Sequence, residues 1–446
     1  MKKIQLSIIV LQIIVFTYSV LLSFLYPYIG LDDGYYLAVA RDLIMGGSLY
    51  DEINTYYCPL TFLLSGISLW FWPSGGAFIL WIPYLICIIL ITFVGFITLS
   101  KTLDLLNTLI LTLFVTNSIL VFGGMYLMNE IPATLFLTLI YKIIIDNEEK
   151  VPCFKISVLI AIAFLFKQYS IYVLPTLIIY YFFSNKRKVS ISIFFYSTFL
   201  ISLAILFIYF TRDIELVNLL QQIAGYLPQS ENIYSSKFEK IFSYSVFRNL
   251  ILIFAPILPL LIYKSGISKN NILLLALLIA ASTSPLLMRQ YDHYFIWGTP
   301  LIFLISFKST ILNSIQFKFT LILVMLVSLY HFRKVILITP HYKISSKTQG
   351  ALIKPLAEQL PAGEKVYIHS GVSTAHYYLN GWKNKSLNYE FATNFNINKI
   401  LELTANEDSV IVSKEMVSSF VKNGFDAKKI PLSEINDHIY VCRKKM

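Results

Sequence analysis

The sequence predicts an all-α, multi-pass membrane protein of about eleven transmembrane helices, followed by a small α/β domain outside the membrane. Three observations predict this fold class. The 446-residue chain is 57% hydrophobic and only 14% charged, whereas about a quarter of the residues of a typical soluble domain are charged. Apolar runs long enough to cross a bilayer recur along the chain. After residue 340 the long apolar runs end, and short strand and helix patterns alternate.

The apolar runs define both the spans and their expected orientation. The inner turns that they leave hold basic residues, among them Lys101, Lys150 and the "NKRK" run at 185–188, as the positive-inside rule requires. We therefore expect a cytoplasmic N-terminus and, with an odd number of spans, an extracytoplasmic C-terminus in the cell membrane. The predicted spans are 5–26, 77–99, 105–123, 131–145, 156–166, 170–184, 190–210, 247–263, 270–287, 293–310 and 316–335.

One apolar stretch decides whether the number of spans is odd. The run "ISVLIAIAFLFKQYSIYVLPTLIIYYFF" is either one long helix with Lys167 at its centre or two short helices that meet at "KQYS". The single helix would bury a lysine at mid-membrane, which costs about 2.5–3.5 kcal/mol on insertion scales, and would place "NKRK" outside. The sequence therefore favours two helices, with Lys167 near the outer surface.

The predicted domains are a transmembrane unit over residues 1–340 and an extracytoplasmic α/β domain over 341–446. The transmembrane unit has a first outer loop at 27–76 and a second at 211–246, where residues 214–224 have the spacing of an interfacial helix. In the tail, "KVYIHSG", "SVIVS" and "HIYVC" predict strands, and "KEMVSSFVKNG" predicts an amphipathic helix that ends at a glycine.

Charge, cysteine and histidine narrow the function classes. The formal net charge is +11, but the basic residues are spread over inner loops and the tail, which indicates membrane topology and no nucleic-acid partner. Cys58 and Cys442 both fall outside in this topology, so they either pair or stay free. The histidines have no metal-ligand spacing, so we predict no metal site and no cofactor.

Two adjacent acids, Asp32 and Asp33, stand where the first span leaves the membrane, in "GLDDGYYLAVARDLIMGG". The apolar residues that follow, beginning at Tyr36, repeat at helical spacing, which predicts a helix in the outer interface with the acids at its N-terminal end. One aspartate is explained as a helix N-cap. The second has no such explanation, so we expect at least one of the pair to be functional.

Six more polar residues fall at the same predicted depth on distant spans: Asn129, Glu130, Lys167, Arg289, Asp292 and His293. Each has a structural explanation, since a first-turn carboxylate, a snorkelling lysine and an interfacial arginine are all common. Acids and bases gathered on one membrane face are better explained as a site.

These residues carry a resemblance to a known family. The stretch "DDGYYLAVARDLI" resembles the first-loop signature of the GT-C superfamily of polyprenyl-phosphate-sugar-dependent glycosyltransferases, which includes protein mannosyltransferases, lipid A aminoarabinose transferases and lipopolysaccharide-core transferases. Asp32 and Asp33 match its acids, Tyr36 its tyrosine, and Ala40 with Arg41 its alanine-arginine pair. Weaker matches at "MNEIPATLF", "LFKQYSIYVLP" and "QYDHYFIWGTPLIFL" extend the likeness over residues 20–310.

The resemblance implies a GT-C fold and an inverting sugar transfer from a polyprenyl-phosphate donor to a hydroxyl of a glycan, lipid or protein at the outer face. It implies that Asp32 is the general base, with Asp33 and Glu130 as further catalytic acids. The substrate-binding residues that we expect are Tyr36, Arg41, Lys167, Arg289, His293 and Tyr294. Some members of the superfamily use a divalent metal and others do not, so metal dependence stays open.

Position 57 departs from the family pattern. Where the aminoarabinose transferases carry a phosphate-contacting lysine, "TYYCPL" has Tyr57, so the cation must come from elsewhere. Two alternatives stay open besides the transferase: a polysaccharide ligase or polymerase, which uses the same donors, and a lipid-linked glycan flippase or other transporter. A transporter should bury charges along a path through the membrane, whereas this chain collects them at one face.

Overall fold

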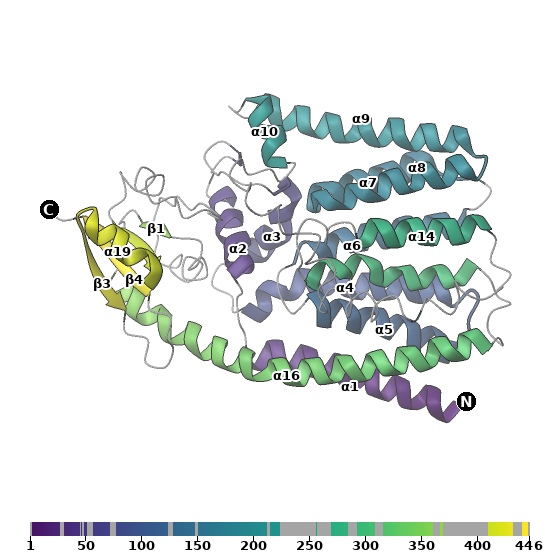
Figure 1. Ribbon diagram of the computed structural model, residues 1–446, viewed down its shortest axis with the longest axis horizontal. Coiled ribbons are helices and arrows are strands. Elements are labelled where there is room, and N and C mark those ends of the chain that lie inside the picture. Colours follow the sequence, from purple (N-terminus) through teal and green to yellow (C-terminus); the bar gives the residue numbers. More distant parts are fainter. Residues whose placement is uncertain are drawn as a thin grey trace.

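A computed structural model gives a long helical bundle with a small sheet at one end (Figure 1). Among the described residues, five helices are long and apolar enough to cross a membrane, as expected for a multi-pass membrane protein. The structure describes residues 2–26, 31–44, 46, 49–50, 57–71, 77–123, 128–147, 150–211, 215–223, 256, 269–283, 292–307, 315–359, 366–368, 409–430 and 439–444.

Each predicted span falls on a helix, except 247–263, of which only residue 256 is described. The total of eleven therefore stays a prediction. The helices are α1 (Lys2–Leu25), α2 (Leu31–Ile44), η1 (Pro59–Phe62), α3 (Leu63–Phe71), α4 (Ala77–Leu99), α5 (Leu105–Gly123), α6 (Glu130–Asp146), α7 (Cys153–Phe166), η2 (Gln168–Tyr172), α8 (Val173–Phe183), α9 (Arg187–Thr211), α10 (Leu216–Ile223), α14 (Lys269–Thr283), η4 (Asp292–Phe307) and α16 (Ile315–Gln359).

Helix α5 lies at the centre of the bundle and α9 at its edge. In the most apolar window of α5, 78% of the residues are buried, against 11% for α9, whose exposed phenylalanines suit a lipid environment. Helices α1 and α16 lie side by side (Figure 1), and Gln12 Nε2 of α1 donates to Ser328 Oγ of α16 at 3.2 Å. Such hydrogen bonds between helices are a common means of association where no water competes.

The ambiguous stretch around Lys167 forms two helices, as predicted. Helix α7 runs in the same direction as α9, because Cys153 contacts Val189 and Ser157 donates to the Ile193 carbonyl four residues further along both helices. A three-residue turn separates α8 from α9, so α8 runs the opposite way, and Ser190 donates back to the Ile178 carbonyl. Lys167 lies at the reversal between α7 and α8.

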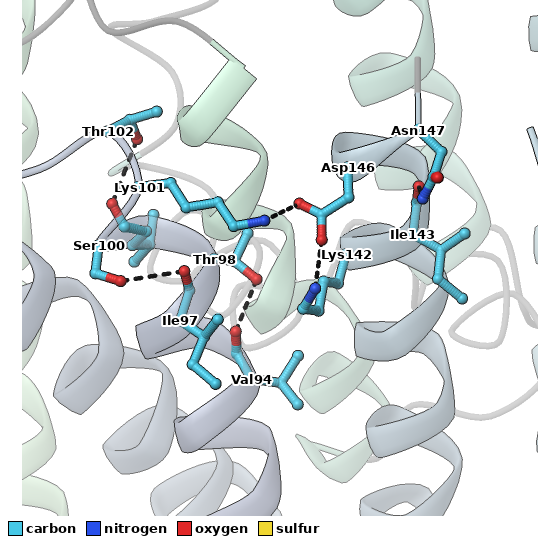
Figure 2. Close-up of polar contacts among 11 residues, drawn as sticks. Val94, Ile97, Thr98, Ser100, Lys101, Thr102, Lys142, Ile143, Asp146 and Asn147 are labelled. Atoms are coloured by element: carbon cyan, nitrogen blue, oxygen red, sulfur yellow. Dashed lines mark hydrogen bonds and ion pairs between the residues drawn. The ribbon is translucent and has the colours of Figure 1, made fainter. Parts of the chain in front are cut away.

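The two ends of the bundle differ in composition. Helices α2, α3 and α10 and the C-terminal sheet lie at one end in Figure 1, which we call the α2 end, and the N-terminus lies at the other. At this other end, which we call the Lys101 end, Asp146 binds both Lys101 and Lys142 (Figure 2), and the basic turn before α9 is found there too. The basic residues expected in inner turns therefore gather opposite α2.

The first outer loop contains more helix than the sequence predicted. Helix α2 begins at Leu31, so Asp32 and Asp33 lie inside its first turn, and the interpretation of one of them as a preceding N-cap is wrong. Helix η1 and the nine-residue α3 follow; we did not predict them, since their apolar run is too short for a span. In the loop at 211–246, α10 confirms a helix within residues 214–224, and its interfacial position stays a prediction. Residues 212–214 and 224–246 lie outside the described residues.

The C-terminal strands form one mixed sheet of order β1-β2-β4-β3. The predicted strands appear as β1 (Val366–Ile368), β2 (Ser409–Ser413) and β4 (Ile439–Lys444), and the predicted helix as α19 (Lys414–Lys422). Strand β3 (Phe425–Ile430) was missed, because its "FDAKKI" sequence is that of a solvated edge strand. Helix α16 runs through residue 340 without a break, and the domain boundary set there stays a prediction.

Candidate functional site

Lys167 lies buried at the α2 end of the bundle. Its backbone is extended, with φ −150° and ψ 113°, because α7 stops at Phe166 and η2 begins at the next residue. Thr61 of η1 donates its hydroxyl to the Phe166 carbonyl at 2.8 Å, which satisfies an oxygen that the end of the helix leaves unpaired. Lys167 is only 3% exposed, so its ammonium group lies inside the protein.

The partner of Lys167 is Glu130, the first residue of α6. Glu130 Oε1 lies 2.7 Å from Lys167 Nζ, and the two side chains are 0% and 4% exposed. A carboxylate in the first turn of a helix is stabilised by the helix dipole, which is the ordinary explanation of such a residue. That explanation does not account for full burial against a lysine, because removing both charges from water carries a penalty of several kcal/mol per ion.

An aromatic cluster formed by Tyr36, Tyr57 and Phe62 lies against the ion pair. Lys167 Nζ is 5.2 Å from the centre of the Tyr57 ring, a cation–π distance. The Tyr57 ring packs edge-on against Tyr36 at 5.2 Å and against Phe62 at 6.2 Å. Tyr50 fixes the Tyr57 backbone by donating its hydroxyl to the carbonyl at 2.7 Å. Position 57 carries no cation, but the ammonium of Lys167 reaches its ring from the extended residue between α7 and η2.

Cys58 completes the surroundings of Lys167. The residue is fully buried, and burial raises the pKa of its thiol to about 12, against the opposing effect of the Lys167 charge. The thiol therefore stays protonated and neutral. Cys58 and Cys442 are both free cysteines in this structure, so of the two alternatives left open the structure has the unpaired one.

Two apolar grooves meet at Pro59, next to this cluster. The larger has a volume of about 580 Å³ and the smaller about 410 Å³, both within the usual range of about 300–1,000 Å³ for ligand sites. The larger groove is lined by residues that include Leu49, Tyr50, Pro59, Leu165, Leu203 and Phe207. The smaller groove is lined by residues that include Ala40, Leu43, Pro59, Leu63, Gly66 and Trp70.

The structure thus brings together Glu130, Lys167 and Tyr36 from the predicted set. Asp32 lies one helical turn before Tyr36 on α2, so the two positions share a face of the helix. Arg41 is partly buried near the end of α2. The side chains of Asp32 and Asp33 are outside the described set, as are those of His293 and Tyr294, whose backbone belongs to η4. Arg289 lies outside the described residues.

Sequence reasoning missed the roles of Tyr50 and Thr61 and the contact between Lys167 and Tyr57. Only position 57 gave a signal, as a departure from the family pattern. Within the part of the chain whose side chains are described, which excludes the two aspartates, no three metal-binding side chains lie together.

Comparisons with known proteins identify the fold. No protein-family model matches the sequence, and no curated protein matches it. The structure resembles ArnT from Cupriavidus metallidurans in the apo state, with a TM-score of 0.60, 10% identity and 97% of each chain covered. It also resembles ArnT from that organism bound to undecaprenyl phosphate, with a TM-score of 0.57, 9% identity and the same coverage. At these identities the likeness shows the fold alone: the described part of this chain is folded like ArnT.

Proposed function

We propose that the protein is an integral membrane, inverting glycosyltransferase of the GT-C kind. It moves a sugar from a polyprenyl-phosphate donor to a hydroxyl of a surface glycan, lipid or protein. The observation that carries this proposal is the buried Glu130–Lys167 pair, set beside two apolar grooves at the α2 end of a bundle with the fold of ArnT. One ArnT structure has undecaprenyl phosphate bound, which supports a donor of that class.

The site is well suited to a substrate with an anionic head and a long apolar tail. The larger groove, lined by Tyr50, Pro59 and Leu165, reaches the neighbours of Tyr57 and Lys167, and takes the polyprenyl chain. Lys167 then meets the phosphate, and Arg289 and His293 supply further positive charge. In a site of low dielectric such cations stabilise the leaving phosphate far more than they would in water.

The transfer itself is a single displacement. The acceptor oxygen bonds to the anomeric carbon while the bond from that carbon to the phosphate oxygen breaks, and the electron pair leaves with the polyprenyl phosphate. Asp32 takes the proton of the acceptor hydroxyl, a role that typically contributes about 10²–10⁴-fold. Asp33 supports this carboxylate, and Tyr36, Arg41 and Tyr294 hold the sugar and acceptor.

The α2 end faces the outside of the cell in this proposal. The support is the gathering of Lys101, Lys142 and the "NKRK" turn at the opposite end, because basic residues mark the cytoplasmic side. The N-terminus is then cytoplasmic and the tail domain of residues 341–446 extracytoplasmic.

Substituting Asp32→Asn tests the function. We expect transfer by the purified protein from polyprenyl-phosphate sugars to fall by about 10²–10⁴-fold, while binding of the donor is retained, because the change removes only the base. Mass analysis of surface glycans with and without the protein selects the sugar and acceptor for this assay. The matched control is Asp146→Asn at the Lys101 end, which makes the same chemical change and leaves transfer intact. Unchanged transfer in the Asp32 variant would rule this residue out as the base.

A further inference from the structure

The ion pair at the α2 end has no net charge, although its lysine stands where an anion would bind. Lys167 Nζ and Glu130 Oε1 are 2.7 Å apart, and both side chains are almost fully shielded from water. The charge of the lysine is therefore already compensated before any ligand arrives. A phosphate that approaches Lys167 finds the carboxylate in place.

The surroundings explain why an anion must accompany this lysine. The ammonium lies against the Tyr57 ring, and its neighbour Cys58 is buried and neutral. An ammonium group shielded from water has lost its hydration, and a carboxylate at 2.7 Å offsets part of that loss.

The position of the pair limits which anion can replace the carboxylate. The larger apolar groove, with a volume of about 580 Å³, is lined by Pro59 and Leu165, which lie two residues along the chain from Tyr57 and Lys167. An anion attached to a long apolar chain that lies in this groove would therefore be held close to the pair. A free inorganic anion gains nothing from the groove and has to shed its water to enter.

We infer that Glu130 is a positioning residue that holds the ammonium group of Lys167 in place, and that the phosphate of the polyprenyl carrier displaces its carboxylate from the ammonium. This inference rests on the proposed function and deepens it. Before the carrier binds, the Glu130 carboxylate lies 2.7 Å from the ammonium, and the carrier exchanges one anion for another at the same lysine. Glu130 therefore competes with the carrier in the ground state, which is the opposite of a direct contact with the sugar.

This inference makes Glu130→Gln and Lys167→Met act in opposite directions on phosphate binding. Glutamine removes the competing charge and leaves the lysine, so the anionic headgroup binds more tightly. Methionine removes the cation, so the headgroup loses its partner. A residue with only a structural role would weaken binding in both variants.

The experiment is a competition between undecaprenyl phosphate and undecaprenol, which differ only in the phosphate, on the purified full-length protein. Native mass spectrometry gives the ratio of the two bound lipids. We expect the wild-type protein to prefer the phosphate and Glu130→Gln to raise that preference by about tenfold or more, since a neighbouring negative charge is removed at low dielectric. Lys167→Met should lower the preference below that of the wild-type protein.

Two further variants keep the test decisive. If Lys167→Met fails to fold because Glu130 is left uncompensated, the double variant Glu130→Gln/Lys167→Met, which is neutral and similar in shape, provides the lysine-free protein. Asp146→Asn breaks a lysine–carboxylate pair at the Lys101 end and should leave the ratio unchanged.

The outcomes separate this inference from the proposed function. A wild-type protein without preference for the phosphate overturns both. A wild-type preference that Glu130→Gln leaves equal or lowers overturns the exchange of anions and leaves the transferase proposal standing. A preference that the lysine-free variants keep undiminished assigns the phosphate to other cations and also overturns the inference.

Discussion

Helix α6 carries a lysine-bound carboxylate at each of its ends, and the two carboxylates differ in their exposure to water. Glu130 begins the helix and Asp146 ends it, about 25 Å away along 17 residues. Glu130 pairs with Lys167 in full burial, whereas Asp146 is 21% exposed and its partners Lys101 and Lys142 are 49% and 28% exposed (Figure 2). Both ends of α6 have a carboxylate paired with lysine, but the groups at the Lys101 end are accessible to water and those at the α2 end are not.

The difference shows where charge is costly in this molecule. An exposed pair such as Lys101–Asp146 costs little and contributes little, typically about 0–1 kcal/mol. A buried pair gives up the hydration of both ions and is often less stabilising than apolar side chains of the same size. The exposed ion pairs at the Lys101 end are thus explained by membrane topology. The buried pair at the α2 end is energetically costly, and a function would account for its presence.

The largest expected effect is on stability when Lys167 is removed. Lys167→Met removes the cation that lies 2.7 Å from the buried Glu130 carboxylate, so we expect the free energy of unfolding to fall by about 3–5 kcal/mol. Equilibrium unfolding of the purified protein in mixed detergent micelles measures it. The double variant Glu130→Gln/Lys167→Met should recover most of the loss, and a double variant as unstable as the single one would contradict the account.

A packing change near the Lys101 end comes next. A methyl group at Gly95 of α4 would lie 2.2 Å from the Phe303 ring of η4, so the ring must shift. We expect Gly95→Ala to lower the free energy of unfolding by about 1–3 kcal/mol. The same unfolding assay measures it. A loss smaller than that caused by Asp146→Asn would show that charge, and not packing, holds this end together.

Removing the Tyr57 ring should have a smaller effect at the α2 end. Tyr57→Leu keeps an apolar side chain but removes the cation–π contact with Lys167, which contributes up to about 2 kcal/mol where the groups are desolvated. Thermal unfolding of this variant, alone and combined with Lys167→Met, measures the coupling between the two residues. Fully additive losses would mean that ring and ammonium do not interact.

The smallest effect is expected for Asp146→Asn. Partial burial raises the pKa of this carboxyl, but hydrogen bonds and charge from Lys101 and Lys142 outweigh burial and hold the pKa below its usual value. Its contribution to stability, below about 1 kcal/mol, is therefore present above the unfolded pKa of about 4 and is lost as the pH falls through the lowered folded pKa.

Unfolding measured across pH 2–7 tests this. The difference between wild type and Asp146→Asn should be constant near neutral pH and should disappear in acid. A difference that grows in acid would reverse the sign of the interaction.

The sequence predicted which residues lie at each end of the bundle better than it predicted which side chains are in contact there. The cost of a lysine at mid-membrane was enough to place Lys167 at a reversal between two helices, and the lysine pattern placed Lys101 opposite it. The contact with Tyr57 could not be predicted, because it depends on how far α7 and the segment before η1 extend past each other. Helix α3 was missed for a related reason, since a largely apolar segment of nine residues does not distinguish a short helix from a loop.

A crosslinking experiment tests most directly the claim that the α2 end receives the anionic carrier. Undecaprenyl phosphate with a photoreactive group beside its phosphate would be bound to the purified protein, irradiated, and mapped by mass spectrometry of the peptides. We predict adducts on the peptides that carry Tyr50 to Leu60 and Leu165 to Tyr169, and a loss of these adducts in Lys167→Met. Adducts concentrated around Lys101 and Asp146 would contradict the account.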